Sequence, residues 1–138
     1  MSGTLIDSNV IIDIADPSSA WKGWARRWME DARLRGSLVF NVIIAAEVAH
    51  EFVSEDRFER VFDRHLWKLE EIPLKAARMA GVAHRDYRLR GGKRERTLPD
   101  FLIGAHAQVA GHRIVTRDPS GYRSYFPDLE IISPETHP

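Results

Sequence analysis

The fold is decided in TLIDSNVIID (residues 4–13), where two apolar runs of different character meet at one carboxylate. The first run, Leu5 and Ile6, predicts a short buried strand, and the second, which begins at Val10, has the spacing of a helix face. Asp7 therefore stands at the carboxyl end of a strand. Ligands of open α/β sheets bind at that end, so Asp7 is a candidate site residue. The alternative interpretation is that Asp7 only caps the helix that follows.

The composition predicts one ordinary domain, because the chain has 138 residues of which 43% are hydrophobic. The sequence contains no cysteine, which excludes disulfides, thiolate metal sites and a thiol nucleophile. Twenty basic and twenty acidic side chains cancel, so any binding of nucleic acid must come from local patches. No apolar run approaches the roughly 20 residues of a membrane span. We therefore expect a soluble, cytoplasmic protein.

The apolar pattern along the chain predicts alternating strands and helices. After the first strand and its short helix, a helix carries Trp21, Trp24 and Trp28 on one face. Further strands are expected at 38–42, 112–116 and 129–132, and further helices at 43–53, 56–70, 74–89 and 99–110, with a single helical turn at 122–126. His65 is expected to be a half-buried core residue. This order is that of an α/β domain with a mainly parallel sheet of four or five strands.

Four acids stand out by their placement, and each has a structural explanation. Asp7 can cap a helix, Asp100 can offset a helix dipole, Glu47 can lie on an exposed face, and Asp118 precedes a proline in a turn. Together they suggest a site, because two of them end strands and two lie early in helices, positions that meet at one edge of a parallel sheet.

A cluster of these acids would need a cation. Two carboxylates about 4 Å apart repel by roughly 4 kcal/mol at an effective dielectric near 20, a large fraction of the stability of a domain. Ligands that are oxygens only suit Mg²⁺ or Mn²⁺ better than zinc.

The segments around these acids resemble the four acidic motifs of PIN-domain nucleases, most closely those of VapC-type toxins of bacterial toxin–antitoxin pairs. The segments are LIDSNV (5–10), AAEV (45–48), LPDFLIGA (98–105) and VTRD (115–118), the last followed by YFP (125–127). No single motif is specific, but all four occur in the family's order. The resemblance spans nearly the whole chain, from Leu5 to about Pro134, at the family's usual total length.

The resemblance implies a three-layer α/β/α PIN domain and a metal-dependent endoribonuclease. It implies an acidic quartet of catalytic and metal-binding residues, namely Asp7, Glu47, Asp100 and Asp118. It also implies supporting residues, namely Ser8, Asn9 and Thr116. Phosphodiester hydrolysis can proceed with Mg²⁺ or Mn²⁺ activating water, so neither histidine nor cysteine is needed as a base. In this scheme Glu47 binds metal or orients the attacking water.

The expected partners are RNA, an antitoxin protein and a second copy of the chain. The one basic segment runs from Lys75 to Arg96, and its last part (Lys93, Arg94, Arg96) lies just before Asp100. This part could hold an RNA backbone or be a solvated helix face. The VapC-type likeness implies the antitoxin and a homodimer. The apolar faces at 21–28 and 58–69 are candidate docking surfaces, and both could equally be core.

Three other functions are weighed against this one. A phosphatase of the haloacid dehalogenase class would use Asp7 as nucleophile, but it needs a second aspartate where this chain has Asn9. A PIN-type housekeeping nuclease in RNA maturation or decay is the nearest rival. The third is a non-catalytic module that binds RNA or protein. EDTA-sensitive degradation of RNA without hydrolysis of a small phosphomonoester would select a nuclease.

Overall fold

The computed structural model describes residues 3–93 and 95–138 and has a five-stranded sheet at its centre. The strands are β1 (Thr4–Ile6), β2 (Leu38–Phe40), β3 (Trp67–Leu69), β4 (Arg113–Val115) and β5 (Ile131–Ile132). Their order is β3-β2-β1-β4-β5, and each neighbouring pair is parallel. The predicted class, an α/β domain with a short parallel sheet, is confirmed.

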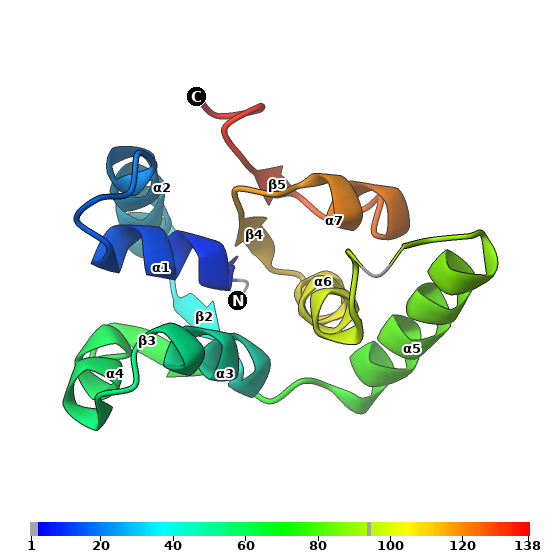
Figure 1. Ribbon diagram of the computed structural model, residues 1–138, viewed down its shortest axis with the longest axis horizontal. Coiled ribbons are helices and arrows are strands. Elements are labelled where there is room, and N and C mark those ends of the chain that lie inside the picture. Colours follow the sequence, from blue (N-terminus) through cyan, green and yellow to red (C-terminus); the bar gives the residue numbers. More distant parts are fainter. Residues whose placement is uncertain (1–2, 94) are drawn as a thin grey trace.

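The sheet is covered by helices on both sides, which confirms the three layers. Within the described ranges the helices are α1 (Ser8–Ala15), α2 (Lys22–Arg35), α3 (Val42–Glu51), α4 (Glu55–Val61), α5 (Leu74–Leu89), α6 (Leu98–Ala110) and α7 (Ser120–Tyr125). Figure 1 shows α1 and α2 on one side of the sheet and α5, α6 and α7 on the other. The core lies between these layers and includes the fully buried side chains of Leu5, Val39 and Ile114.

The strand order places a crevice beside β1. From β1 the chain moves outward to β2 and β3, and it then crosses back to add β4 and β5 on the opposite side of β1. The connections that follow β1 and β4 therefore diverge. In open α/β sheets ligands bind at this switch point, outside the carboxyl ends of the strands.

Local signals account for most helix ends. Asp7 caps α1, and the side chain of Asn41 caps α3 by accepting from the N–H of Ile44 at 2.9 Å. Helix α6 begins with a capping box and ends at Gly111, whose φ of 73° is in the left-handed region that glycine adopts readily. The two ends of α6 explain why its bounds agree with the sequence pattern.

The prediction of one continuous helix over residues 56–70 is wrong. Helix α4 ends at Val61, and the chain then forms β3, which pairs with β2. The ring of Phe62 stacks on Phe40 with centroids 4.2 Å apart, and Trp67 packs edge-on against Phe40 at 5.9 Å. This aromatic group is core and does not form a docking face. His65, expected to be half-buried, lies exposed in the intervening turn.

Two of the three tryptophans in residues 21–28 are covered by the end of the chain. The indole N–H of Trp24 donates to the carbonyl of His137 at 2.7 Å, and the ring of Trp28 meets His137 edge-on at 4.9 Å. Trp21 is 41% exposed. Of the apolar face expected at 21–28, Trp21 is therefore the ring left open to a partner. In the described part of the chain, no helix has the length and apolarity needed to cross a bilayer.

Candidate active site

The loops after β1 and β4 bring the first and last acidic motifs together. Ile6 and Val115 are partners in the parallel register, so Asp7 and Thr116 follow at the same level of the sheet. The N–H of Asp7 donates to the carbonyl of Val115 at 3.0 Å. Glu47 enters this crevice from α3 and Asp100 from the first turn of α6, two helices that contact each other.

Asp7 is buried and held by three donors. Its Oδ1 accepts from the N–H of Ser8 at 2.8 Å, and its Oδ2 accepts from the hydroxyls of Thr116 and Tyr122, each at 2.8 Å. Burial raises the pKa of Asp7, the three hydrogen bonds oppose that rise without cancelling it, and the charge of Asp100 adds to it. The carboxylate is thus fixed in orientation in a place where its negative charge is costly.

Glu47 and Asp100 complete a group of three acids that act on one another electrostatically. Glu47 is half-buried and accepts from the hydroxyl of Ser8 at 2.9 Å. Burial raises the pKa of Glu47, and the charges of Asp7 and Asp100 raise it further. Asp100 accepts from the N–H of Thr97 at 2.9 Å, so its role in the capping box is real and coexists with its place in the crevice.

Asp118 lies at the exposed rim of the crevice and is paired with an arginine. Arg96 donates to both carboxylate oxygens of Asp118, at 2.8 and 3.2 Å, and also to the hydroxyl of Ser120. The hydrogen bond from Arg96 lowers the pKa of Asp118. The structure therefore brings Asp7, Glu47 and Asp100 to one crevice. The fourth predicted acid, Asp118, lies at its rim and is paired with Arg96.

The predicted supporting residues connect these acids. Ser8 joins Asp7 to Glu47, and Thr116 joins Asp7 to the backbone N–H of Asp118, from which its hydroxyl accepts at 3.1 Å. Asn9 accepts from the N–H of Arg117 at 3.1 Å and lies within 3.4 Å of the Thr116 hydroxyl. Each of the three holds the geometry of the loops that carry the acids.

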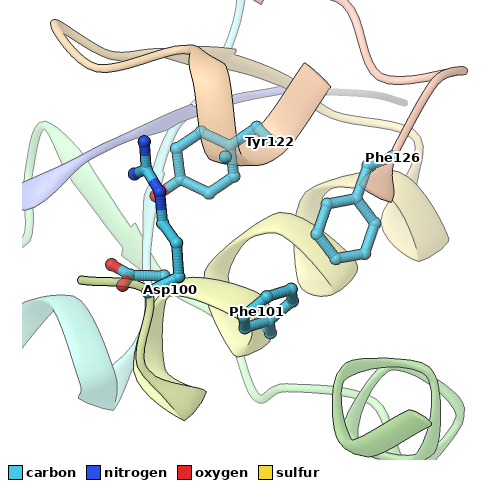
Figure 2. Close-up of a pocket in the computed structure, with 6 residues that line it drawn as sticks. Asp100, Phe101, Tyr122 and Phe126 are labelled. Carbon is cyan, nitrogen blue, oxygen red and sulfur yellow. The ribbon is translucent and has the colours of Figure 1, made fainter. Parts of the chain in front are cut away.

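Tyr122 is a site residue that the sequence pattern did not indicate. It comes from α7, is 5% exposed, and reaches Asp7 with its hydroxyl. Figure 2 shows Asp100 and Tyr122 with their polar ends directed to the same side of a pocket, while the rings of Phe101 and Phe126 close the other side. The available signal was weak: a tyrosine in the helical turn four residues after Asp118.

An open cleft of about 520 Å³ adjoins the acids on the side of α1 and α3. It is lined by residues of those two helices, namely Ser8, Asn9, Ile12, Ala46, Glu47, His50 and Glu51. Glu47 faces this cleft, while Asp100 lines the pocket of Figure 2. The acids thus lie where a long substrate could approach from open space.

The basic residues expected to bind RNA are accessible where the structure describes them. Lys93 is exposed and Arg96 is partly exposed, the latter in its ion pair with Asp118. Arg94 lies outside the described residues. On α5 the basic side chains at Lys75, Arg78, Arg85 and Arg88 are exposed as well.

Asp13, the last residue of the segment TLIDSNVIID, is buried in an ion pair. It accepts from the Nε–H of Arg117 at 2.7 Å and from the hydroxyl of Ser19 at 2.9 Å, and it is 6% exposed. The pair ties α1 to the loop that carries Asp118. Asp13 therefore supports the site's backbone without facing the other acids.

A second group of titratable side chains, the histidine cluster (Glu70, His106 and His112), lies outside the crevice. Its potential ligand atoms all lie within 4.8 Å of one another, and it is the only such group of three among the described residues. The Nε2 atoms of both histidines lie 2.9 and 2.7 Å from the same Glu70 oxygen. By distance alone this cluster would be the better metal site.

Hydrogen bonds on the far side of each imidazole exclude that role. Nδ1 of His112 accepts from the N–H of Gly3 at 2.8 Å, and Nδ1 of His106 lies 2.9 Å from the amide nitrogen of Asn41, whose oxygen is committed to Ile44. Both neutral rings therefore carry their proton on Nε2 and donate it to Glu70. A metal on Nε2 would force the proton to Nδ1, against another donor.

The acidic crevice, in contrast, suits a hard divalent cation. Its donors are carboxylate and hydroxyl oxygens. Burial raises the pKa of Asp7 and Glu47, and the charge of Asp100 raises both further, so a bound cation would relieve both burial and like-charge repulsion. Oxygen donors of this kind fit Mg²⁺ or Mn²⁺, and Asp7, Glu47 and Asp100 are the acids that would hold one.

Comparison with known families agrees with this fold. The family model of the PIN domain matches residues 4–125, so the chain belongs to the PIN domain family. No curated protein matches the chain.

Solved structures share the fold at low sequence identity. FitAcB from Neisseria gonorrhoeae has a TM-score of 0.71 at 17% identity, over 96% of this chain and 98% of that chain. VapBC2 from Rickettsia felis, bound to a promoter DNA fragment, has a TM-score of 0.72 at 14% identity, over 94% and 97%. A toxin–antitoxin complex from Klebsiella pneumoniae has a TM-score of 0.67 at 20% identity, over 92% and 95%.

Proposed function

We propose that this protein is a Mg²⁺- or Mn²⁺-dependent endoribonuclease, the toxin of a VapC-type toxin–antitoxin pair. The observation that carries the proposal is the acidic crevice of a PIN domain, in which Ser8 links the buried Asp7 to Glu47, and burial and the charge of Asp100 raise the pKa of both acids. A bound cation would supply activation of water and neutralisation of charge on the phosphate. Membership of the family supports nuclease chemistry, and the similarity to solved toxin–antitoxin complexes supports the antitoxin.

In this proposal the residues of the crevice have distinct roles in binding the cation, the water and the RNA. Asp7 and Asp100 bind the cation, and Asp118 joins them when its ion pair with Arg96 opens. Glu47 binds the cation or orients the attacking water through its position beside Ser8. With Arg96 released from Asp118, its guanidinium is free to hold a phosphate of the RNA, an anion that arginine binds in bidentate fashion.

The deciding experiment compares RNA cleavage by wild type, Asp100→Asn and Asp128→Asn. We expect the cleavage rate of Asp100→Asn to fall more than about a hundredfold. Changing a residue that only hydrogen-bonds to a metal ligand already costs up to about a hundredfold, and a direct ligand should cost more. Asp128 is exposed and outside the crevice, so its variant controls for loss of one surface charge. EDTA should stop cleavage, and a small phosphomonoester should not be hydrolysed. Full activity in Asp100→Asn would contradict the assignment.

Asparagine is the better substitution at Asp7 as well. Alanine would leave the buried hydroxyls of Thr116 and Tyr122 without their acceptor, at about 1–3 kcal/mol for each group, and a loss of activity could then reflect unfolding. An asparagine oxygen can accept from both hydroxyls while the charge is removed. Asp7→Asn should thus lose RNA cleavage, while its circular dichroism spectrum should match that of the folded wild type.

RNA binding can be tested apart from cleavage in the Asp100→Asn background. Replacing Lys93 with alanine should reduce the slope of log affinity against log salt by about 0.7, the value for one phosphate contact with a single strand. Arg60→Ala is the control, because Arg60 is exposed and lies on α4, outside the basic segment. An unchanged slope for Lys93→Ala would assign the basic segment to a solvated surface.

The toxin assignment predicts two protein partners, an antitoxin and a second copy of the chain. Co-expression with the product of the adjacent reading frame should suppress cleavage and yield a stable complex, and light scattering of the free protein should give the mass of a dimer. Activity that no neighbouring protein suppresses would favour a housekeeping PIN nuclease. No cleavage with any divalent metal, together with retained RNA or protein binding, would favour the binding module.

A further inference from the structure

The close packing of α7 against α6 positions the hydroxyl of Tyr122 beside Asp7. The ring packs over Gly104 of α6, where a Cβ atom would lie 2.9 Å from Tyr122 Cδ1 and 2.5 Å from the ring of Phe126. A side chain at position 104 would therefore push α7 away from the crevice. Figure 2 shows the Tyr122 ring beside Asp100 with its oxygen directed into the crevice. The position of this hydroxyl is thus built into the packing of α6 against α7.

The hydrogen bonds to Asp7 leave one acceptor position of its carboxylate open. A carboxylate has about four lone-pair positions, two on each oxygen. Thr116 and Tyr122 take both positions on Oδ2, each at 2.8 Å, and the N–H of Ser8 takes one on Oδ1 at 2.8 Å. The remaining position lies on Oδ1. Asp7 can therefore offer a cation one oxygen, and it cannot chelate with two.

We propose that Tyr122 is a positioning residue that, together with Thr116, reserves Oδ2 of Asp7 for the protein and leaves Oδ1 as a single ligand atom for the cation. The inference rests on the proposed metal-dependent function and deepens it. It determines which cation the site prefers. Mg²⁺ and Mn²⁺ bind carboxylates through one oxygen in octahedral geometry, whereas Ca²⁺ is larger and readily takes a carboxylate through both oxygens.

The same geometry limits Asp7 to one cation. A carboxylate that bridges two metal ions uses one oxygen for each, and Oδ2 of Asp7 has no position left for a second ion. Any second ion would have to be held by other groups of the crevice, such as Glu47 or Asp100. The proposal therefore predicts that Asp7 contributes to one binding event only.

The test compares cation binding by wild type, Tyr122→Phe and Tyr125→Phe. The first variant removes the hydroxyl and keeps the ring over Gly104. The second removes a hydroxyl from the same helix, α7, and serves as the matched control. Isothermal titration with MnCl₂ and, separately, with CaCl₂ measures each affinity. We expect Tyr122→Phe to lose about tenfold for Mn²⁺, the worth of one hydrogen bond to a charged group, and to keep or gain affinity for Ca²⁺.

The ratio of the two affinities separates positioning from simple structural support. If Tyr122 only stabilised the fold, both cations would bind more weakly by the same factor and the ratio would stay constant, which would overturn the proposal. Thr116→Val removes the other donor to Oδ2 and should shift the ratio in the same direction, which keeps the test valid if Tyr122→Phe folds poorly.

Failure of this inference can be told from failure of the proposed function. Asp100→Asn removes a proposed ligand and leaves both donors to Asp7 in place. Mn²⁺ binding that depends on Asp100, together with an unchanged Mn²⁺-to-Ca²⁺ ratio in Tyr122→Phe, overturns the inference alone. No Mn²⁺ binding by the wild type, or binding that Asp100→Asn leaves intact, overturns the proposed function and the inference with it.

Discussion

The acidic crevice and the histidine cluster both bring titratable side chains together, but the two groups differ in how donors and acceptors are matched. In the histidine cluster each imidazole donates from Nε2 to Glu70 and accepts at Nδ1, so each donor faces an acceptor. In the crevice, carboxylates that accept hydrogen bonds face other carboxylates, and their charges oppose each other. Proximity of ligand atoms therefore does not identify a metal site.

The largest expected effect comes from breaking the histidine cluster. Glu70→Ala would leave two buried Nε2–H groups without an acceptor, at about 1–3 kcal/mol each, so we expect the free energy of unfolding to fall by roughly 2–5 kcal/mol. Glu70→Gln should lose less, since its amide oxygen still accepts. Denaturant unfolding measures both, with the exposed neighbour Glu71→Ala as control. Equal stability of Glu70→Ala and Glu71→Ala would contradict the hydrogen-bond assignment.

The next effect is stabilisation by cation, which should belong to the crevice alone. A cation at one hundred times its dissociation constant stabilises the folded state by about 2.7 kcal/mol. With Mn²⁺ we expect wild type and Glu70→Gln to gain this stability and Asp100→Asn to lose the gain. Thermal unfolding with and without MnCl₂ provides the measurement. A gain that disappears in Glu70→Gln and survives in Asp100→Asn would exchange the roles of the two regions.

The same contrast explains how far the sequence could predict the fold. Helices α5 and α6 were predictable because caps, prolines and apolar spacing are local signals. Strand β3 was not, because Leu66 and Leu69 continue the apolar spacing of the preceding helix, and residues 67–69 become a strand only by pairing with β2. The strand that pairs with β3 is formed by residues 38–40, which are distant from β3 in the sequence.

The candidate site was predictable in its acids and not in their partners. Motif order pointed to Asp7, Glu47 and Asp100, since strand ends and early helical turns can be read locally. The pairing of Arg96 with Asp118 spans 22 residues and that of Tyr122 with Asp7 spans 115, so neither follows from spacing. The pairing of Tyr122 depends on the close packing of α6 against α7 at Gly104, and that of Arg96 depends on the space that Gly121 leaves beside its guanidinium.

A smaller effect, with opposite signs in the two regions, is expected from pH. Burial lowers the pKa of His106, so its contribution to stability is complete above the unfolded value of 6.5 and is lost as the pH falls below it. Burial alone would raise the pKa of Glu70, but hydrogen bonds from His112 and His106 lower it overall, so this support is lost below about pH 4.5. Acid therefore weakens the histidine cluster.

The crevice responds in the other direction. The pKa values of Asp7 and Glu47 are raised by burial, so their charged forms cost stability at neutral pH and protonation relieves that cost. Removing one of these acids in Asp7→Asn should therefore make the loss of stability as the pH falls from neutral toward about 4 steeper than in wild type, whereas His106→Gln should make it shallower. Unfolding curves across this range provide the check, with the exposed His50→Gln as control. Parallel pH profiles for Asp7→Asn and wild type would count against a buried acid at position 7.

The smallest expected change in stability comes from the ion pair at the rim. Arg96 and Asp118 are 23% and 59% exposed, and pairs of this kind contribute less than about 1 kcal/mol. Arg96→Ala should therefore leave the unfolding midpoint nearly unchanged, while it frees Asp118 to join the other acids. If Asp118 is a cation ligand, Mn²⁺ should bind about two- to fivefold more tightly, the same energy expressed as affinity. RNA should bind more weakly, because the guanidinium that would hold a phosphate is gone. Unchanged Mn²⁺ affinity in Arg96→Ala would remove Asp118 from the ligands and leave the three crevice acids as the complete set.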